Sequence, residues 1–251
     1  MAEVLNFEHN GITVNATESP EAMGGLGDNV IGLVGTAPKA DPLIPRNAPF
    51  RINSFTTHAL LDPTGSEEGT LYHAVYQILK VVKVPVYVVI VEAGATPADT
   101  VNNVIGGVDP LTGRKLGLAA LGSVPEDLTI IGAPGFTGTK AVASEFASFG
   151  KRIKARVVLD GKDASVADQV LYSQELGGAD LGFDRCLVVH NMPAVYSKAA
   201  KKNVFLSPSS LAIAALAKVK QWESPGNQVT YAEDVSRVVE YNILDTSTEG
   251  D

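Results

Sequence analysis

Residues 30–38 read Val30-Ile31-Gly32-Leu33-Val34-Gly35-Thr36-Ala37-Pro38, an apolar run that is rich in β-branched residues and ends at proline. Such a run predicts a strand buried on both faces, because a strand with one solvated face would alternate apolar and polar residues. We expect it to be the first core strand. Residues 1–29 lack the apolar density to build a core, so they predict an extended N-terminal arm whose glycine-rich end acts as a flexible joint.

Four further apolar runs predict the other core strands, at residues 84–91, 128–131, 155–160 and 185–189. Helical patterns separate these runs, and they are clearest at residues 71–82, 96–105 and 139–153. Ser207 as an N-cap with Pro208 in the first turn predicts a last helix over residues 209–222. The alternation indicates an α/β sandwich with a largely parallel sheet flanked by helices and preceded by the arm.

The composition limits the classes of protein that fit. With 251 residues and 45% hydrophobic content, the chain can bury a sizeable core. Its net charge of -8 would repel a phosphate backbone, so we expect no nucleic-acid partner. The single cysteine, Cys186, cannot form an intrachain disulfide and is expected to pack as a small hydrophobe. We expect neither a signal peptide nor membrane insertion, because no run reaches about 18 apolar residues.

Four residues stand where predicted strands end and could therefore meet at one edge of the sheet: Glu92, Gly132, Asp160 and His190. Asp160 and His190 could serve as acid and base or share a metal ion. One Asp and one His without further ligand spacing give a weak signal, and helix capping or surface polarity is the preferred explanation. We therefore expect no catalytic, cofactor or metal site. With both residues at solvated strand ends, alanine should change stability by about 1 kcal/mol or less.

The loop at residues 132–140 resembles a phosphate cradle in outline, since it is glycine-rich and joins a strand to a helix. It lacks the Gly-Lys-Ser/Thr ending that places a lysine and a hydroxyl on the phosphates and Mg²⁺. The chain also has no Gly-x-Ser-x-Gly or His-Glu-x-x-His motif and no pair of cysteine ligands. The sequence therefore favours a protein without chemistry of its own.

Residues 8–14, 30–38, 130–135 and 155–160, taken in that order, resemble the tail sheath proteins of contractile phages and R-type pyocins. The resemblance spans nearly the whole chain. It implies a structural subunit that assembles as stacked hexameric rings around a tail tube and contracts to drive the tube through a cell envelope. The implied partners are further copies of the chain, the tail tube protein, and the baseplate and tail terminator proteins. The implied location is the virion tail, after synthesis in the bacterial host cytoplasm.

The resemblance also suggests how subunits are joined, because family members donate terminal arms as strands to their neighbours. In this chain the expected subunit-linking residues are Val4, Phe7, Ile12 and Val14, around an Asn-Gly turn signal. The expected division is an arm and joint at 1–29, an α/β sheath domain at 30–234 and the start of a truncated C-terminal region at 235–251. The alternative is an α/β enzyme with its site near Asp160 and His190.

Overall fold

The computed structural model describes residues 29–162, 166–177, 182–221, 223 and 238–241. The predicted arm, with Val4, Phe7, Ile12 and Val14, lies outside the described residues, as does most of the region after residue 234. Within the described ranges, no helix has the length and apolar character needed to cross a bilayer.

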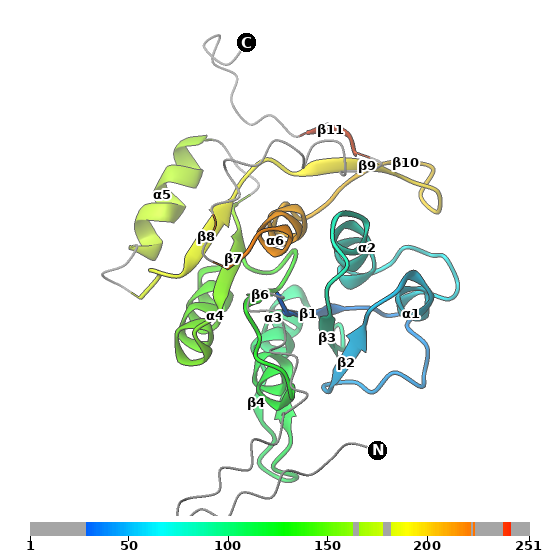
Figure 1. The fold of residues 1–251 in the computed structure, drawn as a ribbon, viewed down its shortest axis with the longest axis horizontal. Helices are drawn as coiled ribbons and strands as arrows, with labels where there is room; N and C mark the ends of the chain where they lie inside the picture. The colour runs from blue at the N-terminus through cyan, green and yellow to red at the C-terminus, as the bar shows by residue number, and fades with distance from the viewer. Residues whose placement is uncertain (1–28, 163–165, 178–181, 222, 224–237, 242–251) are drawn as a thin grey trace, which may run out of the picture.

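A six-stranded sheet forms the centre of the fold, in the order β2-β3-β1-β6-β7-β8 (Figure 1). Strands β3, β1, β6, β7 and β8 run parallel, and only the edge strand β2 is antiparallel to its neighbour. The predicted α/β architecture with a largely parallel sheet is confirmed. The strands are β1 (Ile31–Thr36), β2 (Pro49–Ile52), β3 (Val86–Val91), β6 (Ile130–Gly132), β7 (Arg156–Asp160) and β8 (Cys186–Val189). Every residue of β1 and β3 is buried, as their continuous apolar sequences predict.

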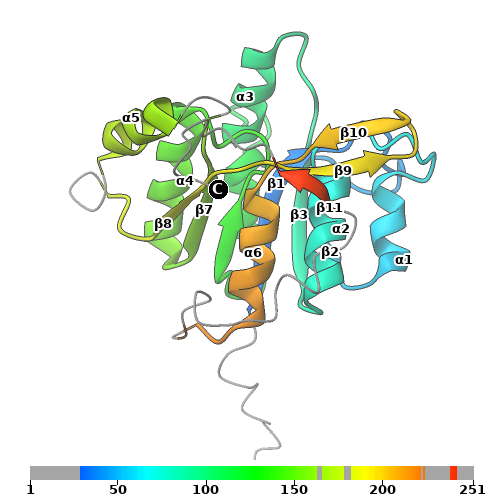
Figure 2. The same ribbon diagram turned by 90° about the horizontal axis from the view of Figure 1, so that it is seen from above.

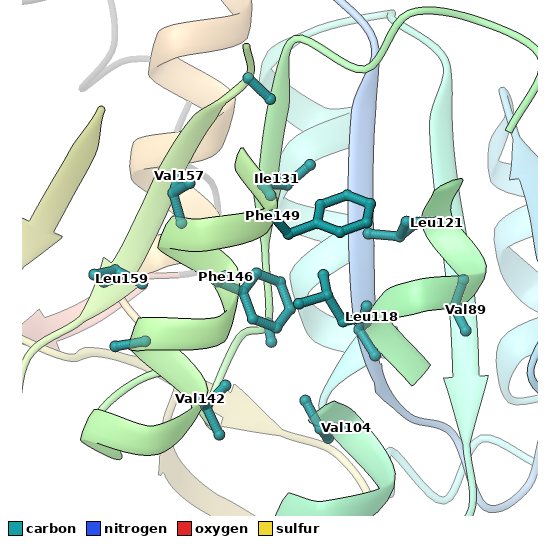
Figure 3. Close-up of a cluster of buried hydrophobic side chains, with 14 of the residues drawn as sticks. Val89, Val104, Leu118, Leu121, Ile131, Val142, Phe146, Phe149, Val157 and Leu159 are labelled. Carbon is teal, nitrogen blue, oxygen red and sulfur yellow. The ribbon is translucent and has the colours of Figure 1, made fainter. Parts of the chain in front are cut away.

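Helices cover both faces of this sheet. One face packs against α2 (Leu71–Val81) and α6 (Ser209–Lys218). The other face packs against α4 (Lys140–Ile153), with α3 (Pro97–Ile105), α5 (Val166–Leu176) and the 3₁₀ helix η2 (Gly117–Ser123) around it. Figure 3 shows Phe146 and Phe149 of α4 reaching toward Leu118 and Leu121 of η2 within this second core. A short helix α1 (Phe55–His58) continues into the 3₁₀ turn η1 (Ala59–Leu61) beside α2.

A second, three-stranded antiparallel sheet lies beyond α2 and α6 and was not expected from the sequence (Figures 1 and 2). Its strands are β9 (Pro193–Ser197), β10 (Lys202–Phe205) and β11 (Val238–Tyr241), with β9 in the centre. A two-stranded ribbon, β4 (Gly107–Val108) with β5 (Lys115–Leu116), follows α3. Short strands like these carry a weak sequence signal, because two to five residues show little periodicity.

The N-terminal end of the described domain is held by Asn29, which is buried. Its side-chain Nδ2 donates to the carbonyl oxygens of Leu216, Ala217 and Val219 at 3.4, 3.1 and 2.7 Å. These carbonyls belong to the C-terminal end of α6, where backbone acceptors lack helical partners. Asn29, predicted as the last residue of the arm, therefore fastens the chain entering β1 to the end of α6.

The N-termini of α3 and α6 are the two places where the sequence predicts an N-cap. Thr96 caps α3 as expected: its hydroxyl accepts from the Asp99 N–H and Pro97 is the first helical residue. The N-cap predicted at Ser207 is wrong, since Pro208 occupies the cap position of α6 and the helix ends earlier than expected, at Lys218. The Ser207 hydroxyl is instead directed to a carboxylate from another strand, Asp160.

Candidate functional site

The carboxyl ends of the parallel strands border a cavity of about 460 Å³. Strand β1 pairs with β3 on one side and with β6 on the other, so later strands of the chain lie on both sides of β1. Open α/β sheets bind ligands at such a change in strand order. The cavity is lined by residues from the loops after β6 and β7, the start of α2, and the segment from β10 into α6. Among them are Glu67, Thr70, His73, Pro134, Gly135, Asp160, Lys162, Phe205 and Ser207.

Asp160, the last residue of β7, lies at this cavity but is 5% exposed. Its Oδ2 accepts from the Gly135 N–H and from the Thr137 hydroxyl, both at 2.9 Å. Its Oδ1 accepts from the Ser209 N–H at 3.0 Å and from the Ser207 hydroxyl. The Asp160 N–H donates to Thr137 Oγ1 at 2.7 Å, so backbone and side chain both hold the same loop.

The expectation of a solvated Asp160 is therefore wrong, and the alternative of helix capping is the one that the geometry supports. A carboxylate offers about four acceptor positions, and four protein donors already occupy them. A general base or a metal ligand needs a free lone pair, and Asp160 has none without breaking part of the domain. Its function in this fold is to join the loop after β6 to the start of α6.

His190 follows β8 and is also less exposed than expected, since its Nδ1 atom is buried without a hydrogen-bond partner among the described residues. Burial lowers the pKa of its imidazole. The side-chain amide atoms of Gln169 on α5 are buried and unpartnered in the same way. Both side chains pack closely against Gly161. A Cβ atom at this position would lie 2.3 Å from His190 Nδ1 and 2.5 Å from Gln169 Oε1, so a larger residue would collide with them.

The residues at the strand ends do not form one catalytic group. Within the ranges that the structure describes, no hydrogen bond or ion pair joins Asp160 to His190. Glu92 is exposed and borders a separate hollow of about 320 Å³, and Gly132 lies against Ile213 of α6. The described residues also contain no group of three or more His, Cys, Asp or Glu side chains placed to hold a metal ion.

The glycine-rich loop after β6 has donors that a phosphate could use, but they bind the protein's own carboxylate. The Gly135 N–H and the Thr137 hydroxyl both donate to Asp160. The Thr137 carbonyl accepts from the Tyr172 hydroxyl at 2.7 Å, which secures the loop to α5. Burial, and next the negative charge of Asp160, raises the pKa of Tyr172 to about 12. The resemblance to a phosphate cradle thus has a structural explanation.

Cys186 at the start of β8 is half-buried and packs against the core that contains α4. Burial, with a smaller contribution from the charge of Asp184, raises the pKa of its thiol to about 12. A thiol that stays protonated at neutral pH is a poor nucleophile and metal ligand. Cys186 therefore behaves as the small hydrophobe that the sequence predicts.

The geometry at the strand ends does not indicate a biochemical function, but comparison with known proteins does. No known family profile matches the chain. The chain is 27% identical, over 251 aligned residues, to a putative prophage major tail sheath protein of Pseudomonas aeruginosa strain UCBPP-PA14. The resemblance to tail sheath proteins is confirmed. The alignment covers 94% of this chain but 62% of the relative, so the chain spans less than two thirds of the relative's length.

A solved structure also matches: the helical sheath of the anti-feeding prophage in its contracted state. The match covers 85% of this chain and 53% of that chain, with 14% sequence identity and a TM-score of 0.44.

Proposed function

We propose that this chain is part of a structural subunit of a contractile tail sheath. The observation that carries the proposal is the 27% identity to a putative prophage major tail sheath protein across 94% of the chain. The geometry at the strand ends supports a structural role. Asp160 is the residue best placed for chemistry, but all of its acceptor positions are occupied by hydrogen bonds within the protein. We propose no enzymatic activity.

In this proposal the subunits assemble as stacked hexameric rings around a tail tube, and shortening of the sheath drives the tube through a cell envelope. The partners are further copies of the chain, the tail tube protein, and the baseplate and tail terminator proteins. The particle is a phage tail or a phage-derived tail, made in the cytoplasm of its bacterial host. Residues 30–234 act as the sheath domain, and residues 235–251 begin a further C-terminal region.

The proposed link between subunits is the arm at residues 1–29, with Val4, Phe7, Ile12 and Val14 in a strand that pairs with a neighbouring copy. Strand addition suits such a segment because backbone hydrogen bonds provide affinity with little demand on side chains. The four apolar residues and the Asn-Gly turn signal suit a strand that pairs with a neighbour. Four such residues are too few for the arm to form a stable hairpin alone.

The proposal is tested by deleting the gene for this chain in a bacterium that carries it and inducing the tail particles. We expect peptides of this chain to dominate the sheath band of wild-type particles in mass spectrometry. The deletion should leave bare tubes in electron micrographs, and a plasmid copy should restore sheathed tails. Sheathed, contractile tails from the deletion strain would refute the proposal.

A further inference from the structure

The β4–β5 hairpin ends in a turn that exposes apolar side chains. Val108, Pro110 and Leu111 lie within four positions and are all exposed, and we call them the apolar tip. Leu111 is 93% exposed. The turn is ordered by its own hydrogen bonds: the Leu111 N–H donates to Asp109 Oδ1 at 3.0 Å, and the Gly113 N–H donates to the Asp109 carbonyl oxygen at 2.8 Å. A tip that is already ordered loses little conformational entropy when it binds a partner.

The hairpin is positively charged beside the apolar tip. Arg114 and Lys115 are both exposed, and residues 107–116 contain a single carboxylate, that of Asp109. Donors within the turn already bind this carboxylate. Arg114 forms no ion pair with any residue that the structure describes. A partner that fits this hairpin therefore offers an apolar recess with negative charge beside it.

The cavity at the strand ends offers such a recess. Its volume of about 460 Å³ is many times the share of one water molecule, about 30 Å³, so it has room for an apolar side chain. Phe205 lines the cavity and is still 46% exposed, so this wall is in contact with solvent. The apolar lining consists of Ala74, Pro134, Met192, Val204, Phe205 and Leu206.

The cavity also has negative charge on the side that leads into α2. Glu67 lines the cavity and Glu68 is exposed next to it. Neither carboxylate forms an ion pair within the described part of the chain. Lys162 lines the cavity as well, but its Nζ lies 3.8 Å from Glu175 Oε2, so its charge already has a partner. The charge that remains unpaired at the cavity is therefore negative.

The apolar tip and the cavity lie on opposite faces of the central sheet. The hairpin follows α3 on the face that packs against α4, whereas the cavity lies at the start of α2 and α6 on the other face. Figure 1 shows β4 below β1, and α2, α6 and β10 above it. We infer that the apolar tip of one copy inserts into the cavity of the next copy, with Arg114 facing Glu67 and Glu68. The inference rests on the proposed function and names one contact between the assembled subunits.

The position of the two features determines what the contact builds. Because a tip meets a cavity on a different face, the contact is heterologous: each copy inserts its tip into one neighbour and receives the tip of another. Such contacts form closed rings when the rotation between copies closes and helical arrays when it does not. The arm is not involved, so this is a second and independent link between copies.

Cysteine cross-linking in assembled sheaths tests the contact. The full-length gene in the tail-producing bacterium is changed to carry both Leu111→Cys and Phe205→Cys, and the purified particles are oxidised. Non-reducing gels should show a ladder of covalent oligomers, because each copy is then linked to two neighbours. Each single variant should stay monomeric, since the native Cys186 is half-buried and burial raises the pKa of its thiol to about 12.

The matched control is Leu43→Cys with Phe205→Cys. Leu43 is 91% exposed, as freely as Leu111, but lies in the loop between β1 and β2. This pair should give no ladder. A ladder from the Leu111 pair alone would support the contact. Assembled sheaths that give no ladder from the Leu111 pair, or equal ladders from both pairs, would refute it.

Charge exchange tests the contact without any new cysteine. Arg114→Glu should lower the number of sheathed tails about tenfold or more, because it places like charges against each other. Arg114→Glu combined with Glu68→Lys in the same chain should restore them, since each contact again joins opposite charges. Recovery in the combined variant would support the contact. Normal sheaths from Arg114→Glu alone, or no recovery in the combined variant, would refute it.

The outcomes separate this inference from the proposed function. If the sheaths assemble but fail the cross-linking test, the contact between tip and cavity is wrong while the sheath function stands. If the strain without the gene still makes sheathed tails, the function itself is wrong.

Discussion

Asp160 joins three segments that are distant in the sequence: the loop after β6, strand β7 and the start of α6. Its partners Gly135 and Thr137 are 25 and 23 residues away, and Ser207 and Ser209 are 47 and 49 residues away. The donors are two backbone N–H groups and two hydroxyls in a site that is nearly closed to water. One side chain thus fixes how two loops meet at the carboxyl edge of the sheet.

Asp160→Ala should lower the free energy of unfolding by about 3 kcal/mol or more, because each buried donor left unpaired costs about 1–3 kcal/mol. Asp160→Asn should cost less, since the amide keeps one acceptor oxygen but turns an NH₂ group toward two donors. Urea denaturation followed by circular dichroism measures both values. The control is Asp127→Ala at an exposed position, where we expect a change within about 0.5 kcal/mol. Equal effects of Asp127→Ala and Asp160→Ala would contradict the structural assignment of Asp160.

His190 should make stability depend on pH. Burial lowers its pKa in the folded chain, so the unfolded chain takes up the proton at higher pH than the folded chain does. Its contribution to stability is therefore fully present above a pH of about 6.5, the ordinary histidine value, and is lost as the pH falls from there through the folded pKa. His190→Asn keeps a polar group that does not titrate. The unfolding free energy of wild-type minus that of the variant should fall from pH 7.5 to pH 5, because only wild-type loses the His190 contribution. A difference that stays constant over this range would disprove the effect.

Helix α4 approaches the sheet closely because residue 150 has no side chain. A Cβ atom at Gly150 would lie 2.3 Å from Val157 Cγ2 on β7 and 3.6 Å from Ile131 Cδ1 on β6. Glycine inside a helix normally costs about 1 kcal/mol relative to alanine. The fold accepts this cost, since a wider spacing would open the core in which Phe146 and Phe149 pack.

Gly150→Ala should therefore destabilise the chain, although alanine is the better helix former. Overpacking a core costs about 1–3 kcal/mol, which outweighs the gain in helix propensity of about 1 kcal/mol. Thermal unfolding with matched Ser148→Ala, on the exposed side of the same helix, separates the two effects. Ser148→Ala should leave the melting temperature unchanged or raise it slightly. A rise for Gly150→Ala as well would show that α4 has room to move outward.

At the scale of the whole molecule, assembly should depend on backbone donors in the arm. Proline removes the N–H group and cannot join a strand ladder where that group is needed, whereas alanine keeps it. In the full-length protein, Ile12→Pro or Val14→Pro should harm sheath assembly far more than alanine at the same positions. Electron microscopy should show few long sheaths, while circular dichroism shows a folded domain. Normal sheaths from both proline variants would exclude strand donation, and unfolding would assign the arm to the core.

The sequence by itself determined the layered α/β architecture and most of its elements. Continuous apolar runs at β1 and β3, helical periodicity at α2 and α4, and the Thr96-Pro97 start of α3 are local signals, because burial and capping depend on neighbouring residues. The resemblance to tail sheath proteins also came from the order of local motifs. Local sequence patterns were therefore sufficient to predict both the fold class and the resemblance to tail sheath proteins.

Only the tertiary structure decided what Asp160 does and where the second sheet lies. The donors to Asp160 come from residues up to 49 positions away, so no local pattern identifies them. Strands β9 and β10 are too short to show periodicity, and β11 joins them from more than 30 residues later in the chain. Long-range hydrogen bonds and the pairing of distant strands are set by how elements pack, which a single sequence does not display.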